Sequence, residues 1–432
     1  MRSRNVQRSA VAFSLAMMFA LATGHTQAPQ PSRPAAVKAA APATTAIVPF
    51  SVHVPDAVLA DLKQRLARAR FPDELTDSGW TYGTNLAYLK NLVAYWRDTF
   101  DWRVQERRLN QFEQFRTNID GLDIHFIHRR AKEPNALPLI LTHGWPGSFA
   151  EFAKVIGPLT DPVRYGGRPE DAFDVVIPSI PGYGFSEKPR QPGYGRERTA
   201  ALFAKLMARL GYSRYGAQGG DLGSGISTQM ALDDASHVTG LHLNLCGGAP
   251  PDPANPSAGV PAEELALMRE RDDFWTDEER GYSHIQGTRP QTLGYALNDS
   301  PIGLAAWIVE KFRIWCDCDG NPEKRFTKDE ILTNITIYWV SETPTSAARF
   351  YYEGRHGGAT PNQRVQVPTA CAAFPKEIRF TPRRWLETRY NLTRFTIMPR
   401  GGHFAALEQP ELLVDDVRAF FRGLKSAQKT GR

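Results

Sequence analysis

The sequence predicts an α/β fold, in which helices cover both faces of a mostly parallel central β-sheet. Two observations indicate this fold. From Phe115 onward, short apolar segments of strand length alternate with segments of helical periodicity, as in successive βαβ units. Within this alternation, Gly219-x-Asp221-x-Gly223 places a carboxylate between small residues, where an expected strand turns sharply into an expected helix.

The first part of the sheet domain is expected to comprise residues 115–248. Its strands are expected at apolar segments bounded by turn residues: Gln114–Ile119, Asp123–His128, Leu137–Thr142, Phe173–Ile177, Val238–Leu245 and the strand that leads into Asp221. Asp120-Gly121 predicts a hairpin between the first two strands. His125 and His128 alternate with apolar residues, and we expect exposed strand residues there rather than metal ligands.

Residues 249–360 interrupt the alternation and are expected to form a helical lid over the strand ends. Their helical segments are rich in aromatic residues: Pro261–Trp275, Gln291–Leu297, Ile302–Phe312 and Lys328–Trp339. Aromatic side chains of the lid are expected to line an apolar pocket: Phe274, Trp275, Tyr295, Trp307, Phe312 and Trp339. Residues 361–432 then complete the sheet domain, with strands at Val367–Ala372 and Thr393–Met398 and helices at Pro382–Tyr390 and Pro410–Phe421.

Residues 46–114 are expected to form an N-terminal helical region. After a strand-like segment, Ile47–Val54, apolar side chains recur at helical spacing in Ala57–Ala69 and Tyr82–Phe100, and Arg103–Gln114 continues as a charged helix. The region contains no cluster of titratable residues that suggests chemistry, so its expected role is packing.

The first 45 residues differ in composition from the rest. Arginines precede a short apolar run, Ala10–Ala22, so residues 1–28 are expected to be a signal peptide, with an uncleaved anchor as the alternative. Residues 29–45 are rich in Ala and Pro and are expected to be a linker. We therefore expect a periplasmic or secreted protein, with no stable membrane span after the leader is removed.

Charge and cysteine content argue against several classes of protein. The chain has 432 residues and a formal net charge of +6, without a run rich in Lys and Arg, which argues against a nucleic-acid partner. Cys246, Cys316, Cys318 and Cys371 are too few for a disulfide framework and lack zinc-finger spacing. Export would permit a disulfide, but the pairing stays open, as does assembly into a homo-oligomer.

Asp221 is the candidate nucleophile, because an ionised carboxylate needs no base to attack an electrophile. The alternative is a Gly-rich turn in which Asp221 caps a helix. His403 follows the last strand and is the candidate base for the water that hydrolyses the resulting ester. Glu377 is the expected acidic partner of His403; Asn244 is a weaker candidate, and Glu387 is expected to be a solvated helix residue.

The segment His143-Gly144-Trp145-Pro146-Gly147 follows a strand whose loop can supply an oxyanion-hole N–H. We expect the backbone N–H groups of Trp145 and Leu222 to hold the carbonyl oxygen of Asp221 during ester hydrolysis. Trp145-Pro146 is also a candidate cis peptide. A tight turn that needs Gly and Pro is compatible with both expectations.

From about Ile47 to Phe421 the chain resembles the microsomal-type epoxide hydrolase family. The resemblance lies in segments found in the family's order: His143–Ser148, Pro181–Ser186, Gln218–Ser224, Leu297–Ala306, Arg349–Tyr351 and Gly401–Phe404. It implies an α/β-hydrolase fold and the opening of an epoxide through an alkyl ester on Asp221. In this mechanism water activated by His403, with Glu377 as its partner, releases a vicinal diol.

The resemblance further implies two lid tyrosines that donate hydrogen bonds to the epoxide oxygen. Tyr282 and Tyr351 match these positions, and Tyr352 adjoins the second. Ring opening produces an alkoxide, which a phenol can stabilise and protonate. The alternative for either tyrosine is packing within the lid. This chemistry requires no metal or organic cofactor.

Other functions stay open at this point. A haloalkane dehalogenase also uses an Asp nucleophile and a His base, although halide departure needs no proton and therefore no paired tyrosines. A non-catalytic ligand-binding protein on a hydrolase scaffold would have no need for five catalytic side chains. An esterase is a weaker alternative, because no Ser occupies the position of Asp221.

Overall fold

The computed structural model describes residues 45–357 and 363–430, with side chains as far as residue 425. The expected signal peptide and linker, residues 1–28 and 29–45, lie outside the described residues except for Thr45. None of the helices in the described ranges is long and apolar enough to cross a membrane.

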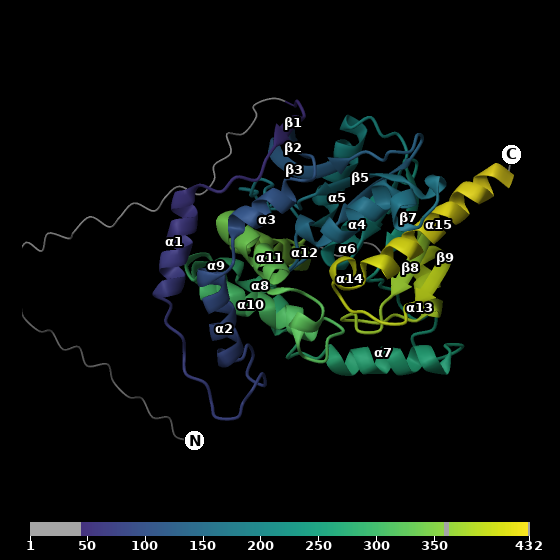
Figure 1. Ribbon diagram of the computed structural model, residues 1–432. Coiled ribbons are helices and arrows are strands. Elements are labelled where there is room, and N and C mark those ends of the chain that lie inside the picture. Colours follow the sequence, from purple (N-terminus) through teal and green to yellow (C-terminus); the bar gives the residue numbers. More distant parts are fainter. Residues whose placement is uncertain (1–44, 358–362, 431–432) are drawn as a thin grey trace, which may run out of the picture. The chain divides into compact units, whose positions relative to one another are not determined.

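The described strands form a single sheet in the order β1-β2-β3-β5-β4-β6-β7-β8-β9 (Figure 1). Their bounds are β1 Val48–Phe50, β2 Gln114–Ile119, β3 Leu122–Arg129, β4 Leu137–Thr142, β5 Phe173–Pro178, β6 Tyr215–Gly219, β7 Val238–Leu243, β8 Val365–Ala373 and β9 Tyr390–Ile397. From β5 to β9 neighbouring strands run parallel, whereas β1, β2 and β3 are antiparallel to their neighbours. The predicted α/β-hydrolase fold with a mostly parallel sheet is therefore confirmed.

Helices cover both faces of this sheet. On one face α4 (Ala153–Thr160) packs against α15 (Pro410–Thr430), and on the other α5 (Arg196–Arg209) packs against α6 (Asp221–Asp233). With both faces covered, the central strands are continuously apolar rather than alternating, as β4 illustrates with Leu139, Ile140 and Leu141. The carboxyl ends of β4, β6 and β7 consequently meet at one edge, where ligands bind in such sheets.

The N-terminal region consists of β1 followed by α1 (Asp56–Ala67), α2 (Leu86–Asp98) and α3 (Trp102–Leu109). Its strand pairs with β2 at the sheet edge, so the region contributes to the sheet as well as to the helical layer. The region packs against the lid: Trp96 Nε1 of α2 donates to Thr336 Oγ1 at 3.0 Å, and Thr84 Oγ1, just before α2, donates to the carbonyl oxygen of Ala306 at 2.8 Å.

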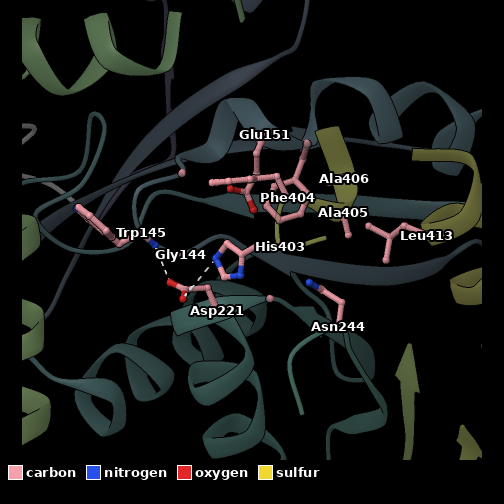
Figure 2. A pocket seen from close by; sticks show the side chains of 13 residues that line it. Gly144, Trp145, Glu151, Asp221, Asn244, His403, Phe404, Ala405, Ala406 and Leu413 are labelled. Atoms are coloured by element: carbon pink, nitrogen blue, oxygen red, sulfur yellow. Dashed lines mark hydrogen bonds and ion pairs between the residues drawn. The ribbon is translucent and has the colours of Figure 1, made fainter. Parts of the chain in front are cut away.

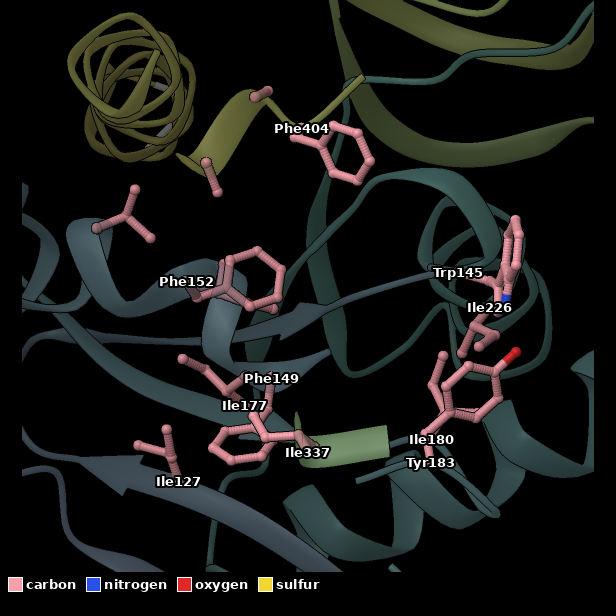
Figure 3. Close-up of a cluster of buried hydrophobic side chains, with 14 of the residues drawn as sticks. Ile127, Trp145, Phe149, Phe152, Ile177, Ile180, Tyr183, Ile226, Ile337 and Phe404 are labelled. Carbon is pink, nitrogen blue, oxygen red and sulfur yellow. The ribbon is translucent and has the colours of Figure 1, made fainter. Parts of the chain in front are cut away.

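The lid follows β7 and contains α7 (Ala262–Phe274), α8 (Gly281–Thr288), α9 (Pro290–Asp299), α10 (Pro301–Ile314), α11 (Lys328–Val340) and α12 (Pro344–His356). The sequence did not predict α8 and α12, because neither carries a sustained apolar stripe at helical spacing. Figure 3 shows Ile337 of α11 in one buried cluster with Ile127 of β3 and Ile177 of β5, so lid and sheet share a core.

The predicted exposure of His125 and His128 is wrong. His125 is completely buried, with Nδ1 2.9 Å from Ser179 Oγ and Nε2 2.9 Å from Gln114 Oε1. The rings of Phe50, Phe149 and Phe185 also surround it. His128 is half-buried against Tyr212, whose hydroxyl lies 2.8 Å from Nε2. The two side chains are three residues apart and lie on opposite faces of β3, and other parts of the fold cover both.

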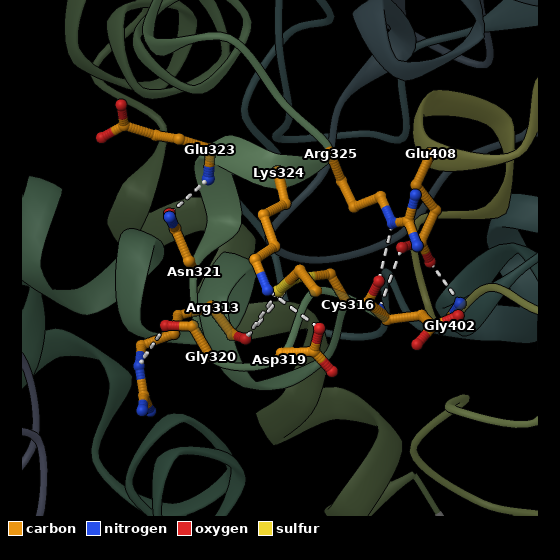
Figure 4. Close-up of a disulfide and its surroundings, with 12 residues drawn as sticks. Arg313, Cys316, Asp319, Gly320, Asn321, Glu323, Lys324, Arg325, Gly402 and Glu408 are labelled. Carbon is orange, nitrogen blue, oxygen red and sulfur yellow. Dashed lines mark hydrogen bonds and ion pairs between the residues drawn. A yellow bond between two sulfur atoms is a disulfide. The ribbon is translucent and has the colours of Figure 1, made fainter.

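All four cysteines form disulfides. Cys246, just after β7, is bonded to Cys371 on the adjacent strand β8, across a sequence separation of 125 residues. Cys316 is bonded to Cys318 in the turn that follows α10. Figure 4 shows this turn beside Gly402 and Glu408, which belong to the C-terminal part of the sheet domain.

Candidate active site

Asp221 lies on a sharp turn between β6 and α6, with a backbone φ of +48°. The flanking glycines make this turn possible. A Cβ on Gly219 would lie 2.3 Å from the carbonyl oxygen of Gly223, and one on Gly223 would lie 1.9 Å from that of Thr142. A strained backbone at a non-glycine residue, held by contacts that admit no side chain, is typical of a functional turn.

Two backbone N–H groups point at the carboxylate of Asp221. Trp145 N–H donates to Oδ1 at 2.7 Å (Figure 2), and Leu222 N–H also bonds to the carboxylate. Burial raises the pKa of Asp221, while His403 and these two N–H groups oppose the rise. The Trp145-Pro146 peptide bond is cis. Both expected oxyanion-hole residues therefore lie at Asp221.

His403 and Glu377 form a buried pair beside Asp221. Nδ1 of His403 lies 2.5 Å from Oε1 of Glu377, which also accepts the N–H of Ile378 at 2.7 Å. On the opposite edge of the imidazole, Nε2 lies 3.6 Å from Oδ2 of Asp221. Burial favours the neutral imidazole, but the carboxylates of Glu377 and Asp221 outweigh it and raise the pKa of His403 to about 9.

The loop that carries His403 is fixed by the turn after α10. The Gly401 N–H donates to Asp317 Oδ2 at 2.9 Å, and the Asp317 N–H donates to Glu408 Oε2 at 3.1 Å. Glu408 also accepts the N–H of Gly402 (Figure 4). Burial raises the pKa of Glu408 to about 7, although these N–H groups oppose the rise.

The two other candidates for the acidic partner lie elsewhere. Asn244 is buried near the site, but its Oδ1 accepts from Gln218 Nε2 at 2.9 Å rather than from His403. Glu387 is exposed on α13 (Arg383–Arg389) and pairs with Arg383 at 2.9 Å.

Tyr282 of α8 and Tyr351 of α12 reach the site from the lid. The Tyr282 ring stacks on that of Trp145 with centroids 4.7 Å apart, and the two tyrosine rings are 5.8 Å apart. The Tyr351 hydroxyl is buried and has no hydrogen-bond partner of standard geometry. Burial, reinforced by the charge of Asp221, raises both phenol pKa values. Tyr352 points away: it is exposed and stacks on His356.

Asp221 faces two cavities. The larger has a volume of about 730 Å³, and Leu222, Phe350 and Tyr351 are part of its wall. Arginines also line it: Arg196, Arg379 and Arg389.

The expectation that six lid aromatics line this pocket is wrong, because none of them borders either cavity at Asp221. Phe312 is buried against Phe326 and against Phe404 of the sheet domain, and Trp339 is buried as well, whereas Tyr295 is 71% exposed. Aromatic residues at helical spacing pack between helices, and this spacing does not place them at the strand ends.

Sequence reasoning missed Glu151, which lies in the 3₁₀ turn Phe149–Phe152. The smaller cavity is bordered by Glu151 together with Asp221 and His403. Burial raises the pKa of Glu151 to about 8; His403 opposes that rise and Asp221 adds to it. A lone carboxyl among apolar residues, just after His143–Ser148, was the available signal.

No group of three or more His, Cys, Asp or Glu residues in the described ranges is arranged to hold a metal ion.

Comparison with known proteins gives consistent matches. Residues 47–152 match the family model for the epoxide hydrolase N terminus, and residues 138–278 match that for the alpha/beta hydrolase fold. Epoxide hydrolase 1 of Sus scrofa is 44% identical over 90% of both chains. The crystal structure of juvenile hormone epoxide hydrolase from the silkworm Bombyx mori has a TM-score of 0.83 at 34% identity, covering 89% of this chain and 96% of that one. The structure of Aspergillus niger epoxide hydrolase has a TM-score of 0.79 at 34% identity, covering 88% and 97%.

Proposed function

Since this chain belongs to the epoxide hydrolase family of the α/β-hydrolase superfamily, we propose that it adds water to an epoxide. The product is a vicinal diol, released from an ester of Asp221. One observation carries the proposal: the Asp221 carboxylate lies 3.6 Å from His403, which pairs with Glu377, and Asp221 borders the same cavity as Tyr351, whose ring packs against that of Tyr282.

In the first step a carboxylate oxygen of Asp221 attacks one ring carbon of the epoxide, and the bond from that carbon to the ring oxygen breaks. Oδ2 is suited to this attack, because Oδ1 accepts the N–H of Trp145. The ring oxygen leaves as an alkoxide, which takes a proton from Tyr282 or Tyr351. Because the pKa of each phenol is raised, both phenols are fully protonated at neutral pH and have a proton to donate.

In the second step water attacks Cγ of Asp221 and its proton passes to Nε2 of His403. The tetrahedral oxyanion is held by the N–H groups of Trp145 and Leu222, and Glu377 stabilises the imidazolium. Esterification has removed the negative charge of Asp221, one of the two carboxylates that raise the pKa of His403. The pKa of His403 therefore falls when a neutral base is needed. Cleavage of the acyl C–O bond releases the diol, whose leaving oxygen takes the proton from Nε2 of His403. The carboxylic acid formed on Asp221 then loses its proton, and the tyrosine that donated in the first step regains one, so that the site returns to its starting state.

The tyrosine pair favours an epoxide over a haloalkane. A leaving halide accepts no proton at neutral pH, so a dehalogenase has no use for two buried phenols near Asp221. Among the described residues the buried Tyr351 hydroxyl has no hydrogen bond of standard geometry and interacts only with the hydroxyl of Tyr282, so a substrate oxygen fits there better than lid packing does. A non-catalytic binding protein would not need the His403–Glu377 pair.

Trapping the ester tests the proposed function. His403→Gln should still form the ester but hydrolyse it very slowly, so that a panel of epoxides adds the mass of one substrate to Asp221. Wild-type protein turned over in ¹⁸O-labelled water should incorporate the label into Asp221, because water attacks Cγ. Turnover of haloalkanes alone, with no epoxide opened by the wild type, would overturn the proposal.

We further propose that the protein is exported. The two disulfides support an oxidising compartment, since cytosolic proteins rarely keep them. N-terminal sequencing of the protein purified from its native host tests this: a mature chain that starts near residue 29 is expected, and an intact Met1 in a cytosolic fraction contradicts it.

A further inference from the structure

The smaller cavity at Asp221 has a volume of about 20 Å³, which is room for a single water molecule. Its wall includes four side chains with a carboxyl, amide or imidazole group: Glu151, Asp221, Asn244 and His403. Neither Tyr282 nor Tyr351 borders it, whereas Tyr351 borders the larger cavity. Asp221 thus lies between the two cavities. The larger cavity is next to Tyr351, which would activate the epoxide, and the smaller, water-sized cavity is next to His403, the proposed base.

Two polar groups on this wall have no other role in the fold. Glu151 is half-buried, and its carboxyl accepts no hydrogen bond from any residue that the structure describes. Asn244 accepts from Gln218 through Oδ1, but its Nδ2 has no acceptor within the same described ranges. Figure 2 shows the Glu151 carboxyl and the Asn244 amide nitrogen directed toward the imidazole of His403 from different sides.

Glycines keep this arrangement tight. A Cβ on Gly147 would lie 2.0 Å from Oε2 of Glu151, and one on Gly220 would lie 2.6 Å from Nδ2 of Asn244. The absence of a side chain at both positions therefore lets each polar group lie directly against the backbone beside the cavity.

We propose that Glu151 and Asn244 are positioning residues for the water that hydrolyses the Asp221 ester; this rests on the proposed function. The water occupies the small cavity and accepts a hydrogen bond from Asn244 Nδ2. It donates one O–H to Nε2 of His403 and the other to Glu151. In the attack its oxygen bonds to Cγ, its first proton moves to Nε2 and Glu151 keeps its protonation state.

Glu151 accepts this hydrogen bond as a carboxylate or through the carbonyl of the neutral acid, so charge is not required of it. A glutamine keeps an acceptor at the same place, whereas a methionine of similar length does not. The pair Glu151→Gln and Glu151→Met therefore separates hydrogen bonding from packing. Glu411, exposed at the start of α15 and absent from both cavities, provides the control Glu411→Met.

The experiment measures two rate constants on the full-length protein with an epoxide that the wild type turns over. Rapid mixing, acid quench and intact-mass analysis give the rate of ester formation and the rate of ester hydrolysis. For Glu151→Met we expect ester formation within about twofold of wild type and hydrolysis slowed about tenfold or more, so that the ester dominates at steady state. Glu151→Gln and Glu411→Met should hydrolyse the ester at close to the wild-type rate.

Hydrolysis at the wild-type rate in Glu151→Met would overturn this inference while leaving the proposed function intact. Equal slowing of both steps would also overturn it, since a packing defect would affect the whole site. Failure of the wild type to form any ester would instead refute the proposed function. If Glu151→Met does not fold, Glu151→Ala and Asn244→Ala provide the same two rates, and slowing confined to hydrolysis is again required.

Discussion

The backbone N–H of His403 donates to the carbonyl oxygen of Trp315 at 2.8 Å. Trp315 directly follows α10 of the lid and is completely buried, and its ring centroid lies 4.9 Å from that of His403. Its indole N–H donates to Glu279 Oε1 at 2.7 Å, an oxygen that also accepts from Lys311. The proposed base is thus held by the lid as well as by the sheet domain.

Trp315→Ala should therefore damage both stability and activity. Removal of a large buried aromatic is expected to lower the free energy of unfolding by about 3–5 kcal/mol, measured by urea denaturation. Tyr295→Ala removes a lid aromatic that is 71% exposed and should change it by less than about 0.5 kcal/mol. Equal losses in the two variants would mean that burial of Trp315 does not stabilise the lid.

Removing the phenol hydroxyls should slow ester formation but not ester hydrolysis. Tyr282→Phe and Tyr351→Phe are each expected to lower the rate of ester formation about 10- to 100-fold, because the alkoxide loses a proton donor. The double variant should lose more than either single one. Single-turnover mass analysis separates the two steps, and Tyr352→Phe is the matched control, since Tyr352 faces away. An effect of Tyr352→Phe equal to that of Tyr351→Phe would contradict the assignment.

The pKa of His403 predicts how stability depends on pH. An unfolded histidine titrates near 6.5, whereas burial and the opposing carboxylates of Glu377 and Asp221 leave the native pKa at about 9. The native state therefore binds the extra proton more tightly. Stability from this proton is fully present below pH 6.5 and is lost as pH rises through 9.

Denaturation of wild type and His403→Gln between pH 6 and 9.5 tests this contribution. The difference in unfolding free energy should shrink with rising pH, by at most about 1.4 kcal/mol per pH unit. Glu151 shifts stability in the same direction, since its pKa is also raised, and its pKa rises further in His403→Gln because His403 opposes that rise. Two parallel curves would show that His403 carries no extra proton.

Arginines in the wall of the larger cavity predict a response to charged substrates. Arg196, Arg379 and Arg389 line the space that reaches Asp221. An epoxide that bears a carboxylate should therefore be converted with a kcat/KM that falls roughly threefold or more between low and physiological salt. Its methyl ester should show little change. Arg379→Gln should weaken the salt effect for the carboxylate alone, and equal salt dependence of acid and ester would contradict the prediction.

How much the sequence could predict depends on how local each signal is. The strand at Leu137–Thr142 was predicted with its observed bounds, because a continuous apolar run between turn residues needs no tertiary information. Asp221 and His403 follow strands at turns that admit only small neighbours, so their places could also be predicted. Tyr282 came only from the family resemblance, because α8 has no apolar period.

Other features depend on contacts that no local pattern records. The burial of His125 results in part from Phe50, a residue of β1 that is distant in sequence. Glu151 occupies a short turn, and its proposed role could not be predicted from the sequence because it depends on Asn244 and His403, which the fold brings to the same cavity. The Trp315–His403 hydrogen bond likewise joins two segments whose pairing depends on how the lid docks.

The Cys246–Cys371 disulfide closes a covalent loop that contains all the lid helices, α7 to α12. The chain leaves β7 just before one sulfur and returns on β8 at the other, 125 residues later. A protease that cuts once between them would leave two fragments that migrate as one species until a reductant separates them. In such a nicked molecule the disulfide would still join the end of β7 to β8, so that these two strands stay paired in the sheet even when the lid is cut.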